Sequence, residues 1–252
     1  MPEATIDINS DLGEFVEALE SGADFELMRY ITSANVACGG HAGDVTTMTK
    51  TLAEARKLNV AVGAHPSYPD RANFGRIESP LSPAEVEDTV HEQIASLMEV
   101  AKQAGVRVIH VKPHGALYHA ANQKRDIAVA LGRAVLALDP RMIMVGQAGA
   151  APLAIWRDMG LQCAAEAFAD RAYEADGTLR KRSVPGALHD VEHAAAQALD
   201  IALRHTVVAG NGTKLTVPAG TICIHSDTPG AATIAREVNR RLKAAGVRVQ
   251  AL

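Results

Sequence analysis

Short runs of Val, Ile and Ala recur along the chain, and each is followed by a polar cluster and then by a helical pattern. The runs occupy 5–9, 33–38, 60–65, 106–111, 142–146, 163–168 and 221–225, and a weaker run closes the chain at 247–252. They are apolar throughout instead of alternating, which is typical of parallel strands buried on both faces. This succession constrains the fold more than any other feature of the sequence.

The segments between the runs carry signals for the starts and ends of helices. Residues 82–85, Ser-Pro-Ala-Glu, form a capping box with proline in the first turn, and Gly105 ends the helical spacing that follows. Asp44 and the pair Thr228-Pro229 are further start signals. Strand–helix alternation over 252 residues predicts an α/β fold, a TIM-like (β/α) barrel of seven or eight strands. A doubly wound open sheet is the alternative.

Two segments interrupt the alternation. Residues 207–220 contain Gly-Asn-Gly between branched residues and predict a β-hairpin, and residues 170–190 form an unusually long loop. Because no linker, repeat or low-complexity tract is visible, we expect a single domain over 1–252 with a hairpin insertion near 207–220.

Composition and charge argue against several classes of protein. A formal net charge of −4 argues against a nucleic-acid partner, since phosphate binding needs a basic face. No apolar stretch reaches the roughly 18 residues of a membrane span, and the N-terminus lacks a signal-peptide pattern. The three cysteines form no CxxC pair. We therefore expect a soluble, cytoplasmic protein without a membrane or nucleic-acid partner.

Polar side chains concentrate where the expected strands end. In parallel α/β folds these carboxyl ends and the loops after them carry the active site. The residues at these positions are Asp7, Asn9, Asp11, Glu14, His41, Asp44, His65, Asp70, Lys112, His114, Gln147, Glu166, Asp170, Arg171, His225 and Asp227. Histidines at the ends of four different strands, flanked by carboxylates, predict one shared site in the barrel mouth.

Four residues near these strand ends, including Glu166, have interpretations of their own. His110 is expected on the outer side of its strand, away from the mouth. Cys38 and Cys223 are expected to be small core residues, because nothing in the sequence identifies a partner that would activate a thiolate. Glu166 is either a catalytic carboxylate or a group that positions another side chain.

The residue types in the mouth allow two kinds of chemistry. Asp11, His65 and His114 form a His₂-carboxylate set that would hold a divalent metal and leave a position open for water. Without a metal, the same residues serve as general acid and base. Lys112 and Arg171 would neutralise an anionic substrate or a developing oxyanion. The residues alone indicate a hydrolase of a C–N bond or of a sugar-linked acyl group.

Motifs spread over nearly the whole chain resemble the LamB/YcsF family, described as the A subunit of bacterial 5-oxoprolinase. They are DINSDLGE (7–14), SANVACGGHAGD (33–44), GAHPSYPD (63–70), FGR (74–76), VKPHGALY (111–118), EAFADRAY (166–173), DGTL (176–179) and ICIHSDTPGA (222–231). The chain departs from the family at two positions. Ser226 replaces the usual Gly, and Ile77 replaces a second Arg after FGR.

The resemblance implies a seven-stranded barrel related to glycoside hydrolases and deacetylases. It also implies ATP-dependent opening of the lactam of 5-oxo-L-proline (pyroglutamate) to L-glutamate, a reaction that this chain would catalyse together with subunits B and C. ATP is needed because the five-membered lactam is unstrained and resonance-stabilised, and phosphorylation of its amide oxygen makes the ring carbon attackable by water. The chain has no GxxxxGK[ST] phosphate-binding motif. The resemblance therefore allows three places for ATP: this chain, a partner subunit or the interface between them.

For this reaction we expect the mouth to activate water and to protonate the ring nitrogen. The catalytic candidates are Asp11, His65, His114, Asp170, Glu14 and His41; the substrate-binding candidates are Asn9, Lys112, Arg171, His225 and Asp227; and the metal candidates are Asp11, His65 and His114. Two alternatives remain open: a metal-dependent carbohydrate deacetylase acting alone, and a non-catalytic substrate-binding subunit.

Overall fold

Seven parallel strands close into a barrel in the computed structural model, which describes residues 4–252. They are β1 (Thr5–Leu12), β2 (Ser33–Ala37), β3 (Ala61–His65), β4 (Val108–Val111), β5 (Ile143–Gln147), β6 (Gln162–Phe168) and β9 (Thr221–Cys223). They pair in this order, and β9 pairs back onto β1. The predicted seven-stranded barrel is confirmed, and the open-sheet alternative is wrong. Residues 1–3 of the expected domain lie outside the described residues.

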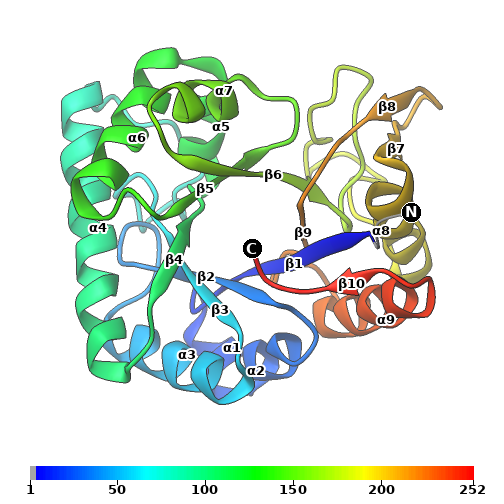
Figure 1. The fold of residues 1–252 in the computed structure, drawn as a ribbon, viewed down its shortest axis with the longest axis horizontal. Helices are drawn as coiled ribbons and strands as arrows, with labels where there is room; N and C mark the ends of the chain where they lie inside the picture. Colours follow the sequence, from blue (N-terminus) through cyan, green and yellow to red (C-terminus); the bar gives the residue numbers. More distant parts are fainter. Residues whose placement is uncertain (1–3) are drawn as a thin grey trace.

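Helices surround the strands, with α4 and α6 on one side of the barrel and α8 and α9 on the other (Figure 1). They are α1 (Val16–Glu20), α2 (Ala23–Met28), α3 (Val45–Leu58), α4 (Pro83–Ala104), α5 (Gly115–Gln123), α6 (Arg125–Leu138), α7 (Ala151–Asp158), α8 (Val191–Arg204) and α9 (Ala231–Ala244). The capping box expected at the start of α4 is formed, since the Ser82 side chain accepts from the Glu85 backbone N–H. Gly105 ends this helix in the left-handed conformation at φ 66°.

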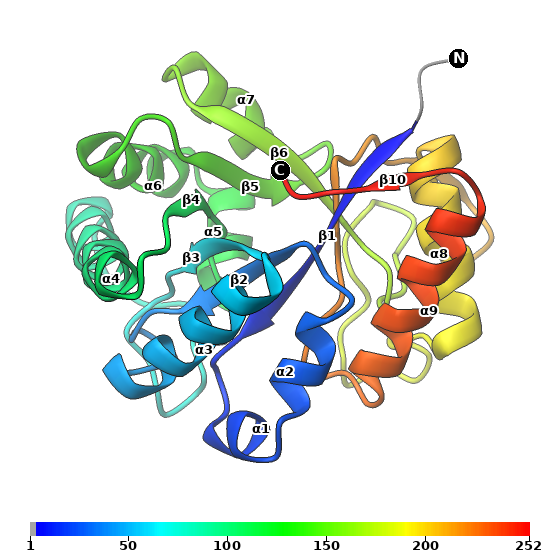
Figure 2. The same ribbon diagram turned by 60° about the horizontal axis from the view of Figure 1, so that its bottom comes forward.

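Three short strands lie outside the ring of seven. Strand β10 (Arg248–Val249) pairs parallel with the start of β1, and Figure 2 shows it alongside that strand. Strands β7 (Thr206–Val208) and β8 (Lys214–Thr216) form an antiparallel hairpin between α8 and β9. The hairpin lies where the sequence predicts one.

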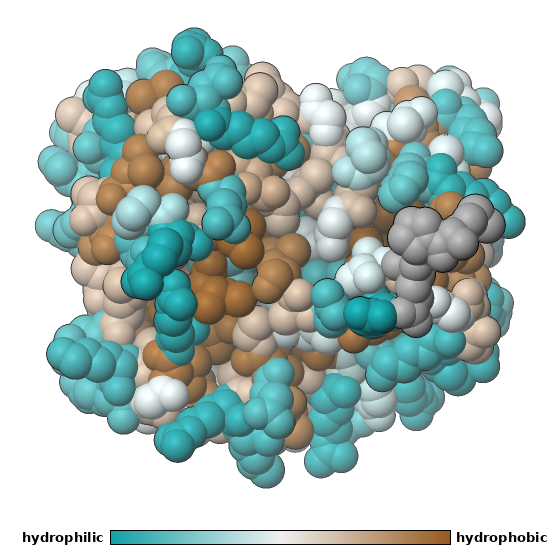
Figure 3. Space-filling view, viewed as in Figure 1, coloured by the Kyte–Doolittle hydropathy of each residue, from teal (hydrophilic) through white to brown (hydrophobic). Residues whose placement is uncertain are grey.

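The apolar core lies between the strands and the helices. On α4, for example, Val86, Val90, Ile94 and Leu97 are all completely buried. Figure 3 shows the molecule from the same side as Figure 1, with hydrophilic side chains gathered towards the outer edge and apolar side chains nearer the centre. Among the helices described within residues 4–252, none is long and apolar enough to cross a membrane.

The inside of the barrel is polar, whereas branched apolar residues usually fill the interior of such barrels. Asp7 on β1 accepts a hydrogen bond from Ser33 Oγ on β2 at 2.7 Å. Two residues further along β1, Asn9 donates to Thr221 Oγ1 on β9 at 2.7 Å and accepts from Asn35 Nδ2 on β2 at 2.8 Å. These buried groups satisfy one another across strands, which removes the penalty for burying them. The stack supports the side chains at the mouth above it.

His110 also belongs to this polar interior, so the expectation that it faces outward is wrong. Residues two apart on a strand share a face, and His110 therefore points to the same side as Lys112. Its Nε2 lies 2.8 Å from Asn35 Oδ1. The ring rests against Gly63 of β3, where an added Cβ would come within 2.1 Å of it. Glycine at this position makes room for a histidine inside the barrel.

Candidate active site

Most of the residues predicted for the site converge at the carboxyl ends of the strands in three adjoining groups. We call Glu14, His41, His65 and His114 the histidine cluster; Asp11, Lys112, Glu166 and Cys223 the lysine cluster; and Arg76, Asp170, Arg171, Arg182, His225 and Asp227 the rim group.

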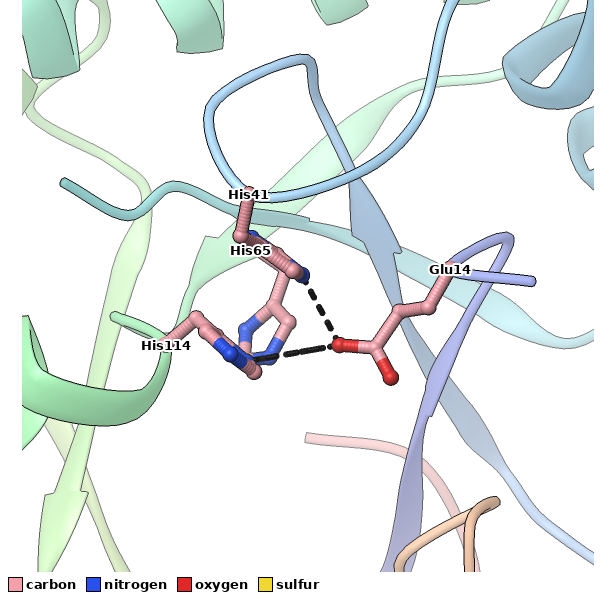
Figure 4. Close-up of side chains that lie close together, drawn as sticks. All are labelled: Glu14, His41, His65 and His114. Atoms are coloured by element: carbon pink, nitrogen blue, oxygen red, sulfur yellow. Dashed lines mark hydrogen bonds and ion pairs between the residues drawn. The ribbon is translucent and has the colours of Figure 1, made fainter. Parts of the chain in front are cut away.

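The histidine cluster draws one side chain from each of four consecutive strand ends. His65 ends β3, His114 precedes α5, His41 lies in the loop after β2, and Glu14 follows β1. Glu14 Oε1 lies 2.8 Å from His41 Nε2 and 3.3 Å from His114 Nδ1. His114 Nδ1 is in turn 3.0 Å from His65 Nε2. Figure 4 shows the Glu14 carboxylate pointing towards the three imidazole rings.

Backbone carbonyls orient two of these rings. His65 Nδ1 lies 2.7 Å from the Lys112 carbonyl oxygen, and His114 Nε2 lies 2.9 Å from that of Phe74. A carbonyl only accepts hydrogen bonds, so these two nitrogens carry the hydrogens. The other two nitrogens, His65 Nε2 and His114 Nδ1, face each other across the cluster. The ring of His41 stacks on that of His114, with centroids 3.7 Å apart and planes inclined by 4°.

Burial and neighbouring charges shift the pKa values of the three histidines in different directions. Burial, followed by repulsion from His65, lowers the pKa of His41 to about 2 and the pKa of His114 to about 3. Burial alone would also lower the pKa of His65, but the Asp11 carboxylate outweighs it and raises that pKa. Burial raises the pKa of Glu14. His41 and His114 are thus neutral at neutral pH, whereas the pKa of His65 is shifted in the opposite direction.

The lysine cluster is a buried ion network. Lys112 Nζ lies 3.0 Å from Asp11 Oδ1, 2.9 Å from Glu166 Oε1 and 3.2 Å from Cys223 Sγ. Burial opposes both charges, but the pairing is stronger, so the pKa of Lys112 is raised and the pKa of Asp11 is held well below its usual range. Because Tyr118 Oη also donates to Glu166 at 2.9 Å, Glu166 positions Lys112 within this network.

Cys223 is the buried core residue that the sequence predicts, and it also contacts a charged group. Its Sγ contacts the Lys112 ammonium, and burial raises the pKa of the thiol, so it remains protonated. The ligand atoms of Asp11, Cys223 and His225 lie within 4.8 Å of one another. Asp11 Oδ2 is also 3.4 Å from His65 Nε2. Asp11 therefore connects all three groups.

In the rim group, Asp170 orients His225. Asp170 is completely buried, accepts from Thr228 Oγ1 and lies 3.1 Å from His225 Nδ1. Burial opposes its charge, but His225 and the hydrogen bonds outweigh that effect and lower the pKa of Asp170. A proton on Nδ1 shared with a carboxylate leaves Nε2 of His225 as the basic nitrogen.

Two arginines pair with one carboxylate at the rim, and a third arginine belongs to the same group. Arg76 Nη2 and Arg182 Nη1 lie 2.7 and 2.8 Å from the two oxygens of Asp227. Arg171 is only 7% exposed, and its Nη2 donates to the Arg180 carbonyl, but its Nε has no hydrogen-bond partner among residues 4–252. The excess of guanidinium groups over Asp227 suits this rim to an anionic ligand.

Not every predicted residue lies at the mouth. Asn9 lies one layer lower, where Thr221 and Asn35 use its amide, and its Oδ1 is 3.3 Å from Lys112 Nζ. Arg76 and Arg182 are not among the predicted site residues. The FGR motif contains the first, and the Arg-Lys-Arg run at 180–182 contains the second.

Comparison with known proteins places this geometry in a family. The sequence model described as LamB/YcsF family matches residues 6–252. A protein of Chloroflexus aggregans, named as the A subunit of 5-oxoprolinase, is 48% identical over 247 residues, covering 98% of both chains. One of the same name from Bacillus subtilis is 42% identical over 98% of this chain and 96% of its own. The crystal structure of a lactam utilization protein from Thermus thermophilus superposes with a TM-score of 0.91 at 42% identity, covering 98% of this chain and 100% of that one. The chain belongs to the LamB/YcsF family.

Proposed function

We propose that this chain is one component of an ATP-dependent 5-oxoprolinase, which opens the lactam of 5-oxo-L-proline to L-glutamate while ATP becomes ADP and phosphate. The relatives named as the A subunit of 5-oxoprolinase support this reaction. The structural observation that carries the proposal is the meeting of two acid–base pairs, His65 with Asp11 and His225 with Asp170, beside a cationic rim. Lactam opening needs both a proton acceptor and a proton donor.

Both pairs lie close to Asp11, and we assign one role to each. His225, held by the ionised Asp170, accepts a proton from the attacking water. His65, whose Nε2 lies 3.4 Å from Asp11 Oδ2, gives a proton to the ring nitrogen as the C–N bond breaks. Asp11 lies close to both, within 4.8 Å of His225 and 3.4 Å from His65. A small substrate bound at Asp11 would reach donor and acceptor together.

The rim group holds the anionic part of the substrate. The free Nε of Arg171 supplies one donor, and Arg76 and Arg182 supply more when an incoming anion competes with Asp227 for them. The ligand is the carboxylate of 5-oxoproline or the phosphate that activates its amide oxygen. ATP binds in this mouth, on a partner subunit or at the interface between them.

Partner subunits, expected to be B and C, cover the mouth. Large apolar residues are exposed in the segments that follow the carboxyl ends of the strands: Val16 (49% exposed), Val45 (63%), Ile77 (56%) and Val184 (42%). Exposed apolar residues gathered at one end of a protein are typical of an interaction surface.

The test is glutamate and ADP formation from 5-oxoproline and ATP, first with this chain alone and then with its partner subunits. We expect activity only in the mixture, and its loss when His225→Gln replaces the native chain. Glutamate formation without ATP, or deacetylation of acetylated sugars by this chain alone, would contradict the proposal. Full activity of a mixture lacking this chain would contradict it as well.

A further inference from the structure

We propose that the histidine cluster binds one divalent transition-metal ion through His65 Nε2, His114 Nδ1 and the Glu14 carboxylate. The inference concerns metal binding, and its test does not depend on the reaction proposed above. In the metal-bound chain His65 Nε2 would be a ligand, and water on the metal would take over the proton-donor role assigned to His65. It rests on how these side chains face one another and on which other groups they contact.

The three electron-pair donors form a triangle of the size that one metal ion requires. His65 Nε2 and His114 Nδ1 are 3.0 Å apart, and Glu14 Oε1 lies 3.3 Å from the second and 3.8 Å from the first. Ligands placed about 2.0–2.2 Å from a zinc ion at tetrahedral angles lie about 3.4 Å from each other. The observed separations bracket this value without any movement of the backbone.

The hydrogen-bonding pattern calls for a cation between these atoms. The outer nitrogens of His65 and His114 donate to the carbonyls of Lys112 and Phe74, so the inner nitrogens present lone pairs to each other and to a carboxylate oxygen. Either a proton or a metal ion must lie between them. Histidines that bind metals characteristically donate their other N–H to a carbonyl or carboxylate, as both do here.

His41 positions Glu14 and is not a ligand in this arrangement. A metal bound to an imidazole lies close to the plane of the ring. The rings of His41 and His114 are almost parallel and 3.7 Å apart, so one ion cannot lie in both planes. His114 has the second hydrogen bond expected of a ligand, whereas His41 Nδ1 has no partner among residues 4–252. His41 Nε2 instead contacts Glu14 Oε1 at 2.8 Å and orients it.

Glu14, and not Asp11, is the carboxylate ligand. Asp11 Oδ1 already pairs with the Lys112 ammonium at 3.0 Å and accepts from Asn35 at 2.8 Å. Within residues 4–252, Glu14 has no Lys or Arg partner. A buried carboxylate without a fixed cation is costly, and a divalent ion would supply the missing charge. This assignment revises the predicted set of Asp11, His65 and His114.

Two imidazoles and one carboxylate favour a first-row transition metal over Mg²⁺ or Ca²⁺, which prefer oxygen ligands. A set of three protein ligands leaves coordination positions for water or substrate. A metal bound there would polarise such a group and lower the pKa of a water molecule.

The experiment titrates metal-stripped protein with Zn²⁺, by calorimetry and by the thermal midpoint. We expect one ion per chain and a midpoint that rises with Zn²⁺ concentration. His65→Ala, His114→Ala and Glu14→Gln should each weaken binding at least about 100-fold. His41→Phe, which keeps the stacked ring but loses the contact with Glu14, should weaken it about 10-fold. The exposed His119→Ala is the control and should bind like the native chain. Asp11→Asn leaves all three proposed ligands in place and should weaken binding less than Glu14→Gln does.

Three outcomes would overturn the assignment: no saturable uptake of Zn²⁺, unchanged binding by His65→Ala and His114→Ala, or loss of binding in Asp11→Asn but not in Glu14→Gln. If an alanine variant fails to fold, the native chain is titrated with Co²⁺ and its visible absorption is measured. An intensified visible absorption that saturates at one equivalent supports the site, and its absence refutes it.

Discussion

Lys112 Nζ lies between Asp11 Oδ1 at 3.0 Å and Glu166 Oε1 at 2.9 Å, and all three side chains are buried. Removing the cation leaves two buried carboxylates facing each other. We expect Lys112→Met to lower the free energy of unfolding by about 3–5 kcal/mol at pH 7, measured by urea denaturation. Adding Glu166→Gln should restore part of this stability, because one of the stranded charges disappears.

Lys57→Met is the matched control, since Lys57 forms an ion pair with Glu54 at 3.1 Å while its side chain is 70% exposed. Its effect should stay below about 0.5 kcal/mol. Equal effects of the two lysine substitutions would show that the buried network does not stabilise the barrel.

The second prediction concerns the contact between Gly63 and His110. A Cβ at position 63 would come 2.1 Å from the His110 ring, so Gly63→Ala should destabilise the protein by about 1–3 kcal/mol or more. His110→Ala in the same chain should relieve the clash, giving a coupling of about 0.5–3 kcal/mol in a double-mutant cycle. Gly220→Ala is the control, because no atom lies within 4 Å of its Cβ position. Simple additivity of the two substitutions would contradict the inward placement of His110.

The third prediction is a pH dependence at Asp24, in the first turn of α2. Burial raises its pKa from 3.8 to about 6, and it accepts the Gly13 N–H at 3.0 Å. Between about pH 4 and pH 6 the folded state therefore holds a proton that the unfolded state has lost, so this group makes stability fall as pH rises. Asp24→Asn keeps the acceptor and removes the titration. The variant should match the native chain near pH 4 and exceed it by up to about 3 kcal/mol at pH 7.

Urea denaturation at several pH values between 4 and 7 measures this difference. A difference between the two chains that does not vary with pH would show that the Asp24 carboxyl titrates normally in the folded state.

The fourth prediction tests the rim as an anion site and rests on the proposed reaction. Arg182→Gln, alone and with Arg76→Gln, should raise the KM for 5-oxoproline or for ATP at least about 10-fold in the reconstituted enzyme, since each guanidinium gives a charge-assisted bond. The substrate whose KM rises is the one whose anionic group the rim binds. Arg141→Gln, an exposed arginine paired with Asp139 before β5, is the control and should leave both constants unchanged. An unaltered KM in the double variant would remove the rim from substrate binding.

The fifth prediction locates the partner surface. Ile77→Glu places a charge among the exposed apolar residues at the mouth and should weaken association with the partner subunits at least about 10-fold. Leu203→Glu, at a similarly exposed residue near the C-terminal end of α8, should have little effect. Analytical ultracentrifugation of the mixtures distinguishes the two. A stronger effect of the Leu203 substitution would place the partner at the opposite end of the barrel.

The sequence identifies the barrel strands well, and its errors have a common physical cause. The apolar pattern predicts the first strand over 5–9, but the strand continues to Leu12, because Asp11 is accommodated inside a polar barrel. The same polar interior explains His110. An interpretation that assumes an apolar barrel interior places a histidine outside, although its even spacing from Lys112 indicates a shared face.

The sequence also indicates which residues share the mouth, because all strand ends meet there. It could not show which of them pair. Arg76 and Asp227 are 151 positions apart, and their ion pair depends on how two loops fold over the mouth. Likewise, the stacking of His41 on His114 depends on ring orientations that backbone carbonyls set. Local patterns contain no information about such contacts.

The bond between Asn9 and Thr221 joins residues 212 positions apart, at the seam where β9 closes the barrel onto β1. Lys112 likewise needs Cys223, from the last barrel strand, to complete its surroundings. Contacts between residues so far apart in sequence cost loop-closure entropy before they are gained. During translation, therefore, the nascent chain cannot complete the site until β9 has left the ribosome. Closing the ring is therefore the step of folding that brings the residues of the site together.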